Sequence, residues 1–312
     1  MTRHLRSLLD INADEMRRIL DLATRVKQNP DAYRDKLRGK VLALIFSKPS
    51  TRTRVSFETG VVQLGAHPMF LSTGGATGLQ LNRGESPHDT AKVMSRYVDG
   101  IVIRTFAQSE VEELAEHGSV PVINALTDKF HPCQALADVM TMRERFGDER
   151  GLKLAFVGPG NNVTHSLLNA GPRAGFDVVC ACPPGLLPHA DVLERARADA
   201  ERAGTSVSVD SNPTRAVAGA HVIYTDTWVS MGQEAEAARL KAELSDYTVT
   251  AELMAAAHPD AVFMHCLPAH RGEEVTAEVI DGPRSVVFDE AENRLHSQKA
   301  LLLLLLGAEP WS

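Results

Sequence analysis

The stretch FSKPSTRTR, residues 46–54, places two arginines and three hydroxyl side chains within five positions. An apolar run before it predicts a buried strand, and Ser50 or Thr51 is a favoured N-cap for a helix that follows. The first turn of a helix has unpaired N–H groups and the positive end of the helix dipole, so it attracts anions. Arg52 and Arg54 add forked donors that match phosphate oxygens. The group therefore predicts a phosphate or oxyanion site.

Other residues that could bind a ligand or take part in a reaction also come directly after predicted strands. Arg104 closes one strand, a glycine turn at 158–162 follows another, and Asp226 and Cys266 follow two more. Each has a plain structural explanation when taken alone: a strand-end charge, a tight turn, or an inert buried cysteine. Ligands of open parallel sheets bind outside the carboxyl ends of the strands. Two such sheets facing each other would bring all these groups, with Ser50 to Arg54, around one cleft.

Strands and helices alternate along the chain, which predicts an α/β fold with parallel sheets. A polar break at 147–151 divides the pattern, so we expect two domains, each a doubly wound, Rossmann-like parallel sheet flanked by helices, with a cleft between them. The expected domains are 1–146, with a C-terminal helix at 291–312 packing back on it, and 147–290. Ser109 and Glu112 form a capping box for a helix at 109–118. The predicted strands are 41–46, 67–71, 100–104, 120–124, 152–157, 178–182, 206–209, 221–225, 261–265 and 285–288.

Composition excludes several classes of protein. The chain has 312 residues, of which 44% are hydrophobic, and a net charge of −7, so a nucleic-acid surface is not expected. Its longest apolar run, 300–306, is too short to span a membrane, and its start lacks the apolar core of a signal peptide. The four cysteines show no C-x-x-C pair or disulfide spacing, which fits a reducing cytoplasm. The twelve histidines form no metal-binding motif, so we expect no catalytic metal.

The glycine turn at 158–162 resembles part of a dinucleotide-binding motif, but other positions of that motif do not match. The third glycine of G-x-G-x-x-G is replaced by Val163, and Cys182-Pro183 stand where an acid should hold the ribose. No P-loop motif occurs either. The sequence therefore favours Rossmann topology without NAD or another cofactor, and a nicotinamide-dependent dehydrogenase is the weaker alternative.

Taken together, the motifs resemble the aspartate/ornithine carbamoyltransferase family over nearly the whole chain. The matching segments are STRTR at 50–54, HPCQALAD at 131–138, DTWVSMG at 226–232, HCLP at 265–268 and FDEAENRLH at 288–296. The resemblance implies a transferase for carbamoyl phosphate and L-ornithine that makes L-citrulline in arginine metabolism, and a trimer in which a neighbouring subunit can contribute a loop residue, here Gln80.

The resemblance also implies roles for individual residues. Arg52, Arg104, His131 and Cys266 would be catalytic. The remaining carbamoyl phosphate ligands would be Ser50, Thr51, Thr53, Gln80, Gln134, Leu267 and Arg294. The ornithine ligands would be Asn162, Asp226, Ser230 and Met231.

The residue types indicate how transfer would proceed and which acceptor is used. An amine with a pKa near 10.4 must lose a proton before it attacks the carbonyl, and Cys266 could accept that proton or orient the amine. A dicarboxylate acceptor such as aspartate would require Arg or Lys in the loop 226–233, which has neither. N-acetylornithine would leave Asp226 without a cation, and putrescine would leave the carboxylate donors unused. A catalytically silent homologue would be expected to lose Cys266, Arg52 or His131, and all three are present.

Overall fold

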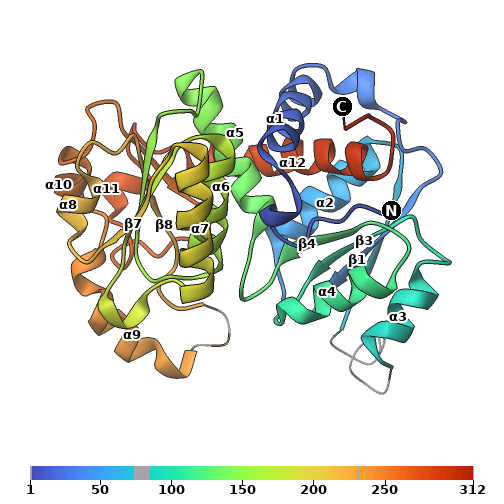
Figure 1. The fold of residues 1–312 in the computed structure, drawn as a ribbon, viewed down its shortest axis with the longest axis horizontal. Helices are drawn as coiled ribbons and strands as arrows, with labels where there is room; N and C mark the ends of the chain where they lie inside the picture. Colours follow the sequence, from blue (N-terminus) through green and yellow to red (C-terminus); the bar gives the residue numbers. More distant parts are fainter. Residues whose placement is uncertain (1, 74–84, 231, 233, 312) are drawn as a thin grey trace. The chain divides into compact units, whose positions relative to one another are not determined.

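The computed structural model describes residues 2–73, 85–230, 232 and 234–311. The chain divides into two compact units: unit 1 comprises residues 1–140 and 293–312, and unit 2 comprises residues 141–292. Each unit is built on one parallel sheet with helices on its faces (Figure 1). The predicted α/β fold class is therefore confirmed.

Unit 1 contains a four-stranded parallel sheet in the order β2-β1-β3-β4. The strand order turns back between β1 and β3, because β2 pairs with β1 and β4 pairs with β3. Its strands are β1 (Val41–Phe46), β2 (His67–Ser72), β3 (Gly100–Arg104) and β4 (Val122–Leu126). Its helices are α1 (Ala13–Gln28), α2 (Thr51–Gln63), α3 (Pro87–Met94), α4 (Gln108–His117) and most of α5 (Pro132–Phe146) and α12 (Val287–Leu305), with 3-10 turns η1 (Leu8–Asp10) and η2 (Pro30–Tyr33).

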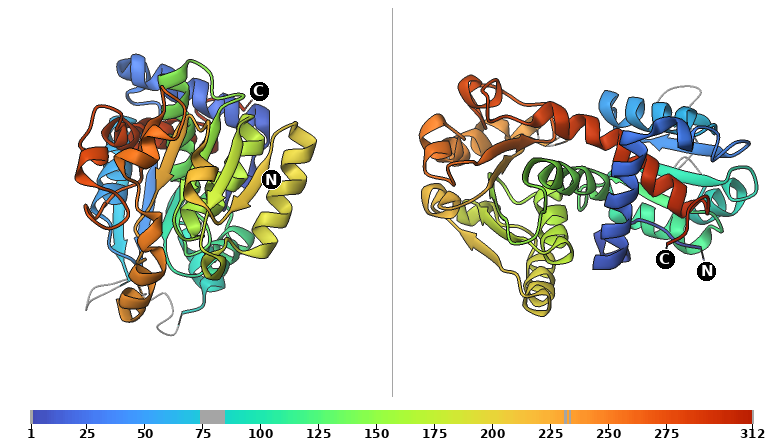
Figure 2. Two further views of the ribbon diagram at one scale, coloured as in Figure 1. Left: turned by 90° about the vertical axis from the view of Figure 1, so that its left-hand side faces the viewer. Right: turned by 90° about the horizontal axis from the view of Figure 1, so that it is seen from above.

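Strands β1, β3 and β4 of unit 1 are buried on both faces, as expected for parallel strands with a helical layer on each side, whereas the edge strand β2 is partly exposed. Alternate residues of β1 and β3, such as Ile45 and Ile103, pack with α3 and α4 in one apolar cluster. The C-terminal helix α12 returns to this unit and lies beside α1 (Figures 1 and 2), where Lys27 Nζ donates to Asn293 Oδ1 at 2.8 Å. It also contacts α2, since Lys299 Nζ donates to Gln63 Oε1 at 2.9 Å.

Unit 2 contains a five-stranded parallel sheet in the order β7-β6-β5-β8-β9, which turns back between β5 and β8. Figure 1 shows α6 and α7 on one face of this sheet and α8, α10 and α11 on the other. Its strands are β5 (Lys153–Val157), β6 (Asp177–Ala181), β7 (Val207–Asp210), β8 (Val222–Thr225) and β9 (Val262–His265). Its helices are α6 (Asn162–Ala174), α7 (Ala190–Ala203), α8 (Pro213–Val217), α9 (Ala237–Leu244), α10 (Ala251–Ala255) and α11 (Ala277–Ile280), with 3-10 turns η3 (Pro184–Leu186), η4 (Glu234–Glu236) and η5 (Ser245–Tyr247).

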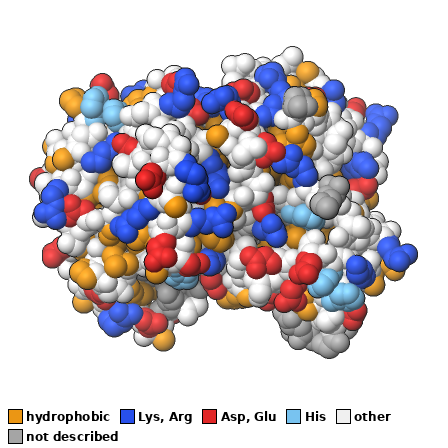
Figure 3. Space-filling model, in the orientation of Figure 1, with side chains coloured by type: hydrophobic (Ala, Val, Ile, Leu, Met, Phe, Trp, Pro, Cys, Tyr) orange, Lys and Arg blue, Asp and Glu red, His pale blue; other side chains and the backbone are white. Residues whose placement is uncertain are grey.

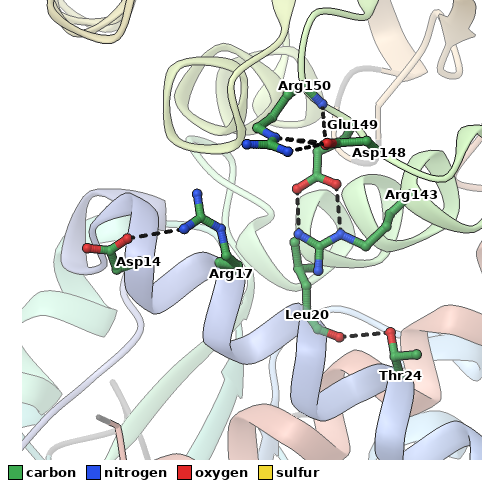
Figure 4. A network of polar contacts seen from close by, with 8 residues as sticks. All are labelled: Asp14, Arg17, Leu20, Thr24, Arg143, Asp148, Glu149 and Arg150. Atoms are coloured by element: carbon green, nitrogen blue, oxygen red, sulfur yellow. Dashed lines mark hydrogen bonds and ion pairs between the residues drawn. The ribbon is translucent and has the colours of Figure 1, made fainter.

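The last turn of α5 belongs to unit 2 and is fixed there by an ion pair. Arg143 donates through Nε and Nη2 to the two carboxylate oxygens of Glu149, at 2.7 and 2.6 Å (Figure 4). Glu149 is only 4% exposed, and a two-pronged guanidinium–carboxylate contact is the strong form of such a pair. The pair joins the end of α5 to the polar segment that leads into β5.

Two sequence predictions about secondary structure are wrong. No strand forms at 285–288: Ser285 makes one bridge to Phe263, and α12 begins at Val287. The capping box of Ser109 and Glu112 does not form either, because α4 begins at Gln108 with Ala107 at its N-cap.

Acidic and basic side chains are interspersed over the face drawn in Figure 3. Among the described residues, no helix combines the length and apolar character needed to cross a bilayer. All four cysteines are described, and none is in a disulfide.

Candidate active site

Unit 1 carries three arginines whose charges act on one imidazole. We call Arg52, Arg104, Arg294 and His131 the cationic cluster. Arg52 lies in the first turn of α2, directly after β1, and Arg104 is the last residue of β3. The cluster therefore lies at the carboxyl ends of β1 and β3, where the strand order turns back and where open α/β sheets bind ligands.

The two arginines of the first turn of α2 have different partners. Arg54 Nε donates to Glu58 Oε1 at 3.0 Å, and its guanidinium lies 3.7 Å from the ring centre of Phe70. Arg52, by contrast, is one of the charges that act on His131. The predicted phosphate-binding arginine of this turn is thus Arg52, while Arg54 is committed to neighbours on α2 and β2.

Burial is the main cause that holds the pKa of His131 well below its ordinary value, and the charges of Arg294, Arg104 and Arg52 act in the same direction. His131 is 4% exposed. Its imidazole is consequently neutral at neutral pH and can donate one N–H while adding no charge. Three guanidinium groups around a neutral donor form a site suited to a doubly charged phosphate.

A chain of buried side chains fixes Arg294 in this cluster. Arg294 Nη1 donates to Gln134 Oε1 at 2.5 Å, and Arg294 Nη2 donates to Thr53 Oγ1 at 3.3 Å. Gln134 Nε2 in turn donates to Asp138 Oδ1 at 2.8 Å. The N-terminus of α2 is capped at the same place, because Ser50 Oγ accepts from Thr53 N at 3.3 Å. Helices α2, α5 and α12 thereby hold the predicted ligands Ser50, Thr53, Gln134 and Arg294 together.

Unit 2 carries a second group, Asn161, Asp226 and Cys266, which we call the acceptor cluster. These residues follow β5, β8 and β9, which are consecutive neighbours in the sheet. Cys266 Sγ donates to Asp226 Oδ1 at 3.1 Å, and Asn161 Nδ2 donates to Asp226 Oδ2 at 2.8 Å. Thr227 N adds a third hydrogen bond, to Oδ1 at 2.8 Å. The carboxylate is 7% exposed, and these three donors stabilise its charge.

Buried polar groups behind the acceptor cluster fix the segment that carries Cys266. His265 Nδ1 accepts from Leu267 N at 2.8 Å, so its proton is on Nε2, which faces Glu274 Oε1 at 3.3 Å. Glu290 accepts from His265 N at 2.9 Å and from the Tyr224 hydroxyl at 3.0 Å. Leu267 itself has a left-handed φ of +58°, an uncommon conformation for a non-glycine residue. The backbone on both sides of Cys266 is therefore fixed.

The backbone of residues 186–188, also in unit 2, covers the glycine turn after β5. A Cβ atom on Gly160 would lie 2.1 Å from Pro188 N and 2.4 Å from Leu187 C, so only glycine fits beneath that loop. Gly160 N also donates to Leu186 O at 2.7 Å. In dinucleotide-binding proteins the corresponding space over the glycines receives the pyrophosphate. Backbone fills that space here, which weakens the dehydrogenase alternative further.

The structure places the remaining predicted residues as follows. Thr51 is the first residue of α2, Asn162 is the first residue of α6, Ser230 follows β8 and Leu267 follows Cys266. Gln80 and Met231 lie outside the described residues. Four supporting residues had no role predicted from the sequence, namely Asn161, His265, Glu274 and Glu290. An N-cap asparagine before α6 was the available signal for the first, whereas nothing in the sequence marks the contacts of the other three.

Two groups of described side chains bring three possible metal ligands within 4.8 Å of one another: Asp226, His265 and Cys266, and His270, Glu273 and Glu274. In the first group both ring nitrogens of His265 are engaged, by Leu267 N and Glu274. In the second group Lys241 Nζ donates to Glu273 Oε1 at 2.5 Å. These contacts do not identify a metal site in either group, and the absence of a catalytic metal stays a prediction.

Two domain models of one protein family match the chain, one after the other along the sequence. The family model for the aspartate/ornithine carbamoyltransferase carbamoyl-P binding domain matches residues 3–144, and the model for the Asp/Orn binding domain matches residues 150–305. The ornithine carbamoyltransferase of Symbiobacterium thermophilum is 56% identical over 303 residues, covering 96% of this chain and 97% of the relative. That of Carboxydothermus hydrogenoformans is 54% identical over 307 residues, covering 98% of each chain. The solved ornithine carbamoyltransferase of Pyrococcus furiosus superposes with a TM-score of 0.94 at 50% identity, covering 99% of this chain and 98% of that one. The predicted resemblance is confirmed, and the chain belongs to the aspartate/ornithine carbamoyltransferase family.

Proposed function

We propose that the protein transfers the carbamoyl group of carbamoyl phosphate to the side-chain amine of L-ornithine, which yields L-citrulline and phosphate. The observation that carries the choice of acceptor is the Asp226 carboxylate. Its three hydrogen-bond donors stabilise it as an anion, and the described part of the loop that follows β8 contains no lysine or arginine. A buried anion at this place suits an acceptor that brings an ammonium group and disfavours a dicarboxylate.

Carbamoyl phosphate would bind to unit 1. The phosphate would lie on the N-terminus of α2, among Ser50, Thr51, Thr53 and the guanidinium of Arg52. Arg104, His131, Gln134 and Arg294 would donate to the remaining phosphate oxygens and to the carbonyl oxygen. A preorganised donor aimed at charge that develops in the transition state is typically worth about 3–4 kcal/mol. We propose that Arg52, Arg104 and His131 supply this stabilisation as the phosphate leaves.

Ornithine would bind to unit 2 by its amino-acid headgroup. The α-ammonium would pair with Asp226, while Asn162, the first residue of α6, would donate to the α-carboxylate at the helix N-terminus. Ser230 and Met231 are proposed to complete this headgroup site. The side-chain amine is then left to attack the carbamoyl carbon once it has lost a proton.

Cys266 is proposed to act beside the reacting groups, with Leu267 adjoining the carbamoyl phosphate. The thiol donates its hydrogen to Asp226, so a thiolate would place a second negative charge next to that carboxylate. This arrangement favours an orienting role for the thiol over that of a general base. Substitution of Cys266 by serine, which keeps the donor, should therefore retain more activity than substitution by alanine, whereas a general base would be lost equally in both.

One assay tests the proposed reaction and its acceptor. Purified protein is given carbamoyl phosphate with L-ornithine, N-acetyl-L-ornithine, putrescine or L-aspartate, and each carbamoylated product is quantified. We expect citrulline to form with the highest kcat/KM of the four. Faster carbamoylation of aspartate or putrescine would contradict the role given to Asp226.

We also propose that the protein assembles as a homotrimer, with Gln80 reaching the carbamoyl phosphate site of a neighbouring copy. Unit 1 exposes apolar side chains that support a contact between copies. Val55 and Val62, one heptad apart on α2, are 54% and 59% exposed, and Met69 on the edge strand β2 is 41% exposed. Light scattering coupled to size-exclusion chromatography should give three times the chain mass, and a monomer would contradict this proposal.

A cytoplasmic location is proposed on the chemistry of the cysteines. None of the four forms a disulfide. Thiols persist in this state where the environment is reducing.

A further inference from the structure

We propose that Asn161 is a positioning residue for the acceptor: it aims one oxygen of Asp226 at the α-ammonium and ties that oxygen to the start of α6. This inference rests on the proposed function and deepens it. It assigns the selection of an α-amino acid headgroup to a residue that does not itself contact the substrate.

Asn161 joins two parts of unit 2 through the two ends of one amide. Its Oδ1 accepts from Val163 N at 3.0 Å and Thr164 N at 3.1 Å, which caps the N-terminus of α6. Its Nδ2 donates to Asp226 Oδ2 at 2.8 Å, across 65 residues of sequence. Thr164 Oγ1 closes the capping box by accepting from Asn161 N at 3.3 Å. An amide held at both ends has one orientation, since reversal would turn a donor toward the helix N–H groups.

The hydrogen bonds of Asp226 show which oxygen is left for a ligand. Each carboxylate oxygen has two lone pairs. Oδ1 accepts from Thr227 N at 2.8 Å and from the Cys266 thiol at 3.1 Å, so both of its lone pairs are used. Among the described residues, Oδ2 accepts a hydrogen bond from Asn161 alone, so its second lone pair can receive an ammonium hydrogen. Asn161 therefore holds the oxygen that meets the substrate.

The same amide sets the spacing between two binding sites of opposite charge. The N-terminus of α6 favours an anion, and Asp226 favours a cation. An α-amino acid presents a carboxylate and an ammonium on one carbon atom, at a fixed separation. Asn161 ties the helix end to the carboxylate and so matches the protein to that separation.

The test replaces Asn161 by serine and compares two acceptors. Serine still caps α6, because its hydroxyl can accept from the helix N–H groups, but it is too short to reach Asp226. 5-Aminopentanoate keeps the carboxylate and the attacking amine of ornithine and lacks only the α-amine. For Asn161→Ser we expect the ornithine KM to rise about tenfold with kcat within about threefold of wild type, as for lost ground-state binding. The kcat/KM for 5-aminopentanoate should barely change, so the preference for ornithine should fall about tenfold.

A matched control separates positioning from general loosening of the turn. Thr164→Val breaks the capping box and leaves the bond between Asn161 and Asp226 in place. We expect a lower Tm and an unchanged preference for ornithine. If Thr164→Val loses the preference as well, or if Asn161→Ser keeps it, the proposal is overturned. Asn161→Thr, a second residue able to cap, provides the same comparison should the serine variant fail to fold.

A binding measurement keeps this inference distinct from the proposed reaction. L-2-Aminopentanoate has the ornithine headgroup without the attacking amine, and its Kd can be measured by calorimetry in the presence of carbamoyl phosphate. We expect about tenfold weaker binding to Asn161→Ser than to wild type. If wild type makes no citrulline but this difference remains, the proposed reaction fails and the positioning role stands. If wild type makes citrulline and the two Kd values agree, the positioning role fails and the reaction stands.

Discussion

The two units place their chemistry at the same position in the fold and give it opposite charge. In unit 1 the cationic cluster lies after β1 and β3, and in unit 2 the acceptor cluster lies after β5, β8 and β9. In both sheets the strand order turns back at that point. In the first, the charges of three arginines act on a neutral imidazole, whereas in the second one carboxylate accepts three hydrogen bonds. The topology thus sets where a ligand can bind, and a few side chains set its charge.

The two clusters also differ in how they are held. The cationic cluster depends on side chains from α5 and α12, through Gln134 and Arg294. The acceptor cluster depends on an N-cap and on buried acids, through Asn161, Glu274 and Glu290. Substitutions can therefore be chosen that act on one unit and leave the other intact.

The largest expected effect comes from Arg52→Ala, which removes a charge from the cationic cluster. We expect kcat to fall about 10²–10³-fold, the usual loss for one preorganised transition-state donor, with normal circular dichroism. Arg54→Ala is the matched control two positions away. Because Arg54 is paired with Glu58 and Phe70, its loss should leave kcat within a few-fold and cost less than about 1 kcal/mol of stability. Equal losses of activity in the two variants would refute the distinction between these arginines.

Asp226→Asn tests the acceptor cluster with an almost isosteric side chain. The substitution removes the charge that meets the ammonium, which should cost about 2–3 kcal/mol, or roughly 30–150-fold in kcat/KM for ornithine. The KM for carbamoyl phosphate should stay within about twofold. Steady-state kinetics with each substrate varied in turn measures both values. A loss confined to carbamoyl phosphate would reverse the assignment of the two units.

Tyr224→Phe probes the buried acids behind Cys266. The variant leaves Glu290 Oε1 without the hydroxyl that donates to it at 3.0 Å in the interior of unit 2. A buried acceptor that loses its donor costs about 1–3 kcal/mol, which chemical denaturation would detect. Tyr247→Phe is the control, since its hydroxyl donates to the backbone oxygen of Ser211 at a partly buried site and should cost less. A smaller loss from Tyr224→Phe than from Tyr247→Phe would show that Glu290 does not depend on this bond.

The smallest expected effect is a pH dependence of stability that originates in the cationic cluster. The folded pKa of His131 lies well below the unfolded value of about 6.5, so below that pH the unfolded chain binds a proton that the folded chain does not. Stability from this residue is present above about pH 7 and is lost as the pH falls, so its contribution should be smaller at pH 5.5 than at pH 7.5. Urea unfolding of wild type and His131→Gln at pH 5.5 and pH 7.5 measures the contribution of His131 to the free energy of unfolding. An equal loss in the two proteins would contradict the neutral state of His131.

The sequence was sufficient to predict the alternation of elements, because buried parallel strands such as 41–46 and 100–104 are unbroken apolar runs. It also identified the residues that end them, including Arg104 and Asp226. It failed at 285–288, where β-branched and aromatic residues suggested a strand but Val287 begins a helix. Short apolar runs do not distinguish a strand from the first turn of a buried helix.

The supporting residues of the site were harder to predict, since their partners are distant in sequence. The capping box of Ser109 is absent because Gln108 enters the helix and accepts from Thr127 at 2.8 Å and Asn124 at 3.3 Å. From the sequence, Asn161 is indistinguishable from an ordinary N-cap, and only the structure shows its hydrogen bond to Asp226, 65 residues later. Such pairs are set by sheet order, which local patterns do not contain.

The most direct test of the opposite charges of the two clusters is a calorimetric titration of freshly dissolved carbamoyl phosphate, without ornithine, into wild type, Arg52→Ala and Asp226→Asn. We predict a Kd for Asp226→Asn within about twofold of wild type and a Kd for Arg52→Ala at least tenfold weaker. Weaker binding to Asp226→Asn, together with normal binding to Arg52→Ala, would contradict the account.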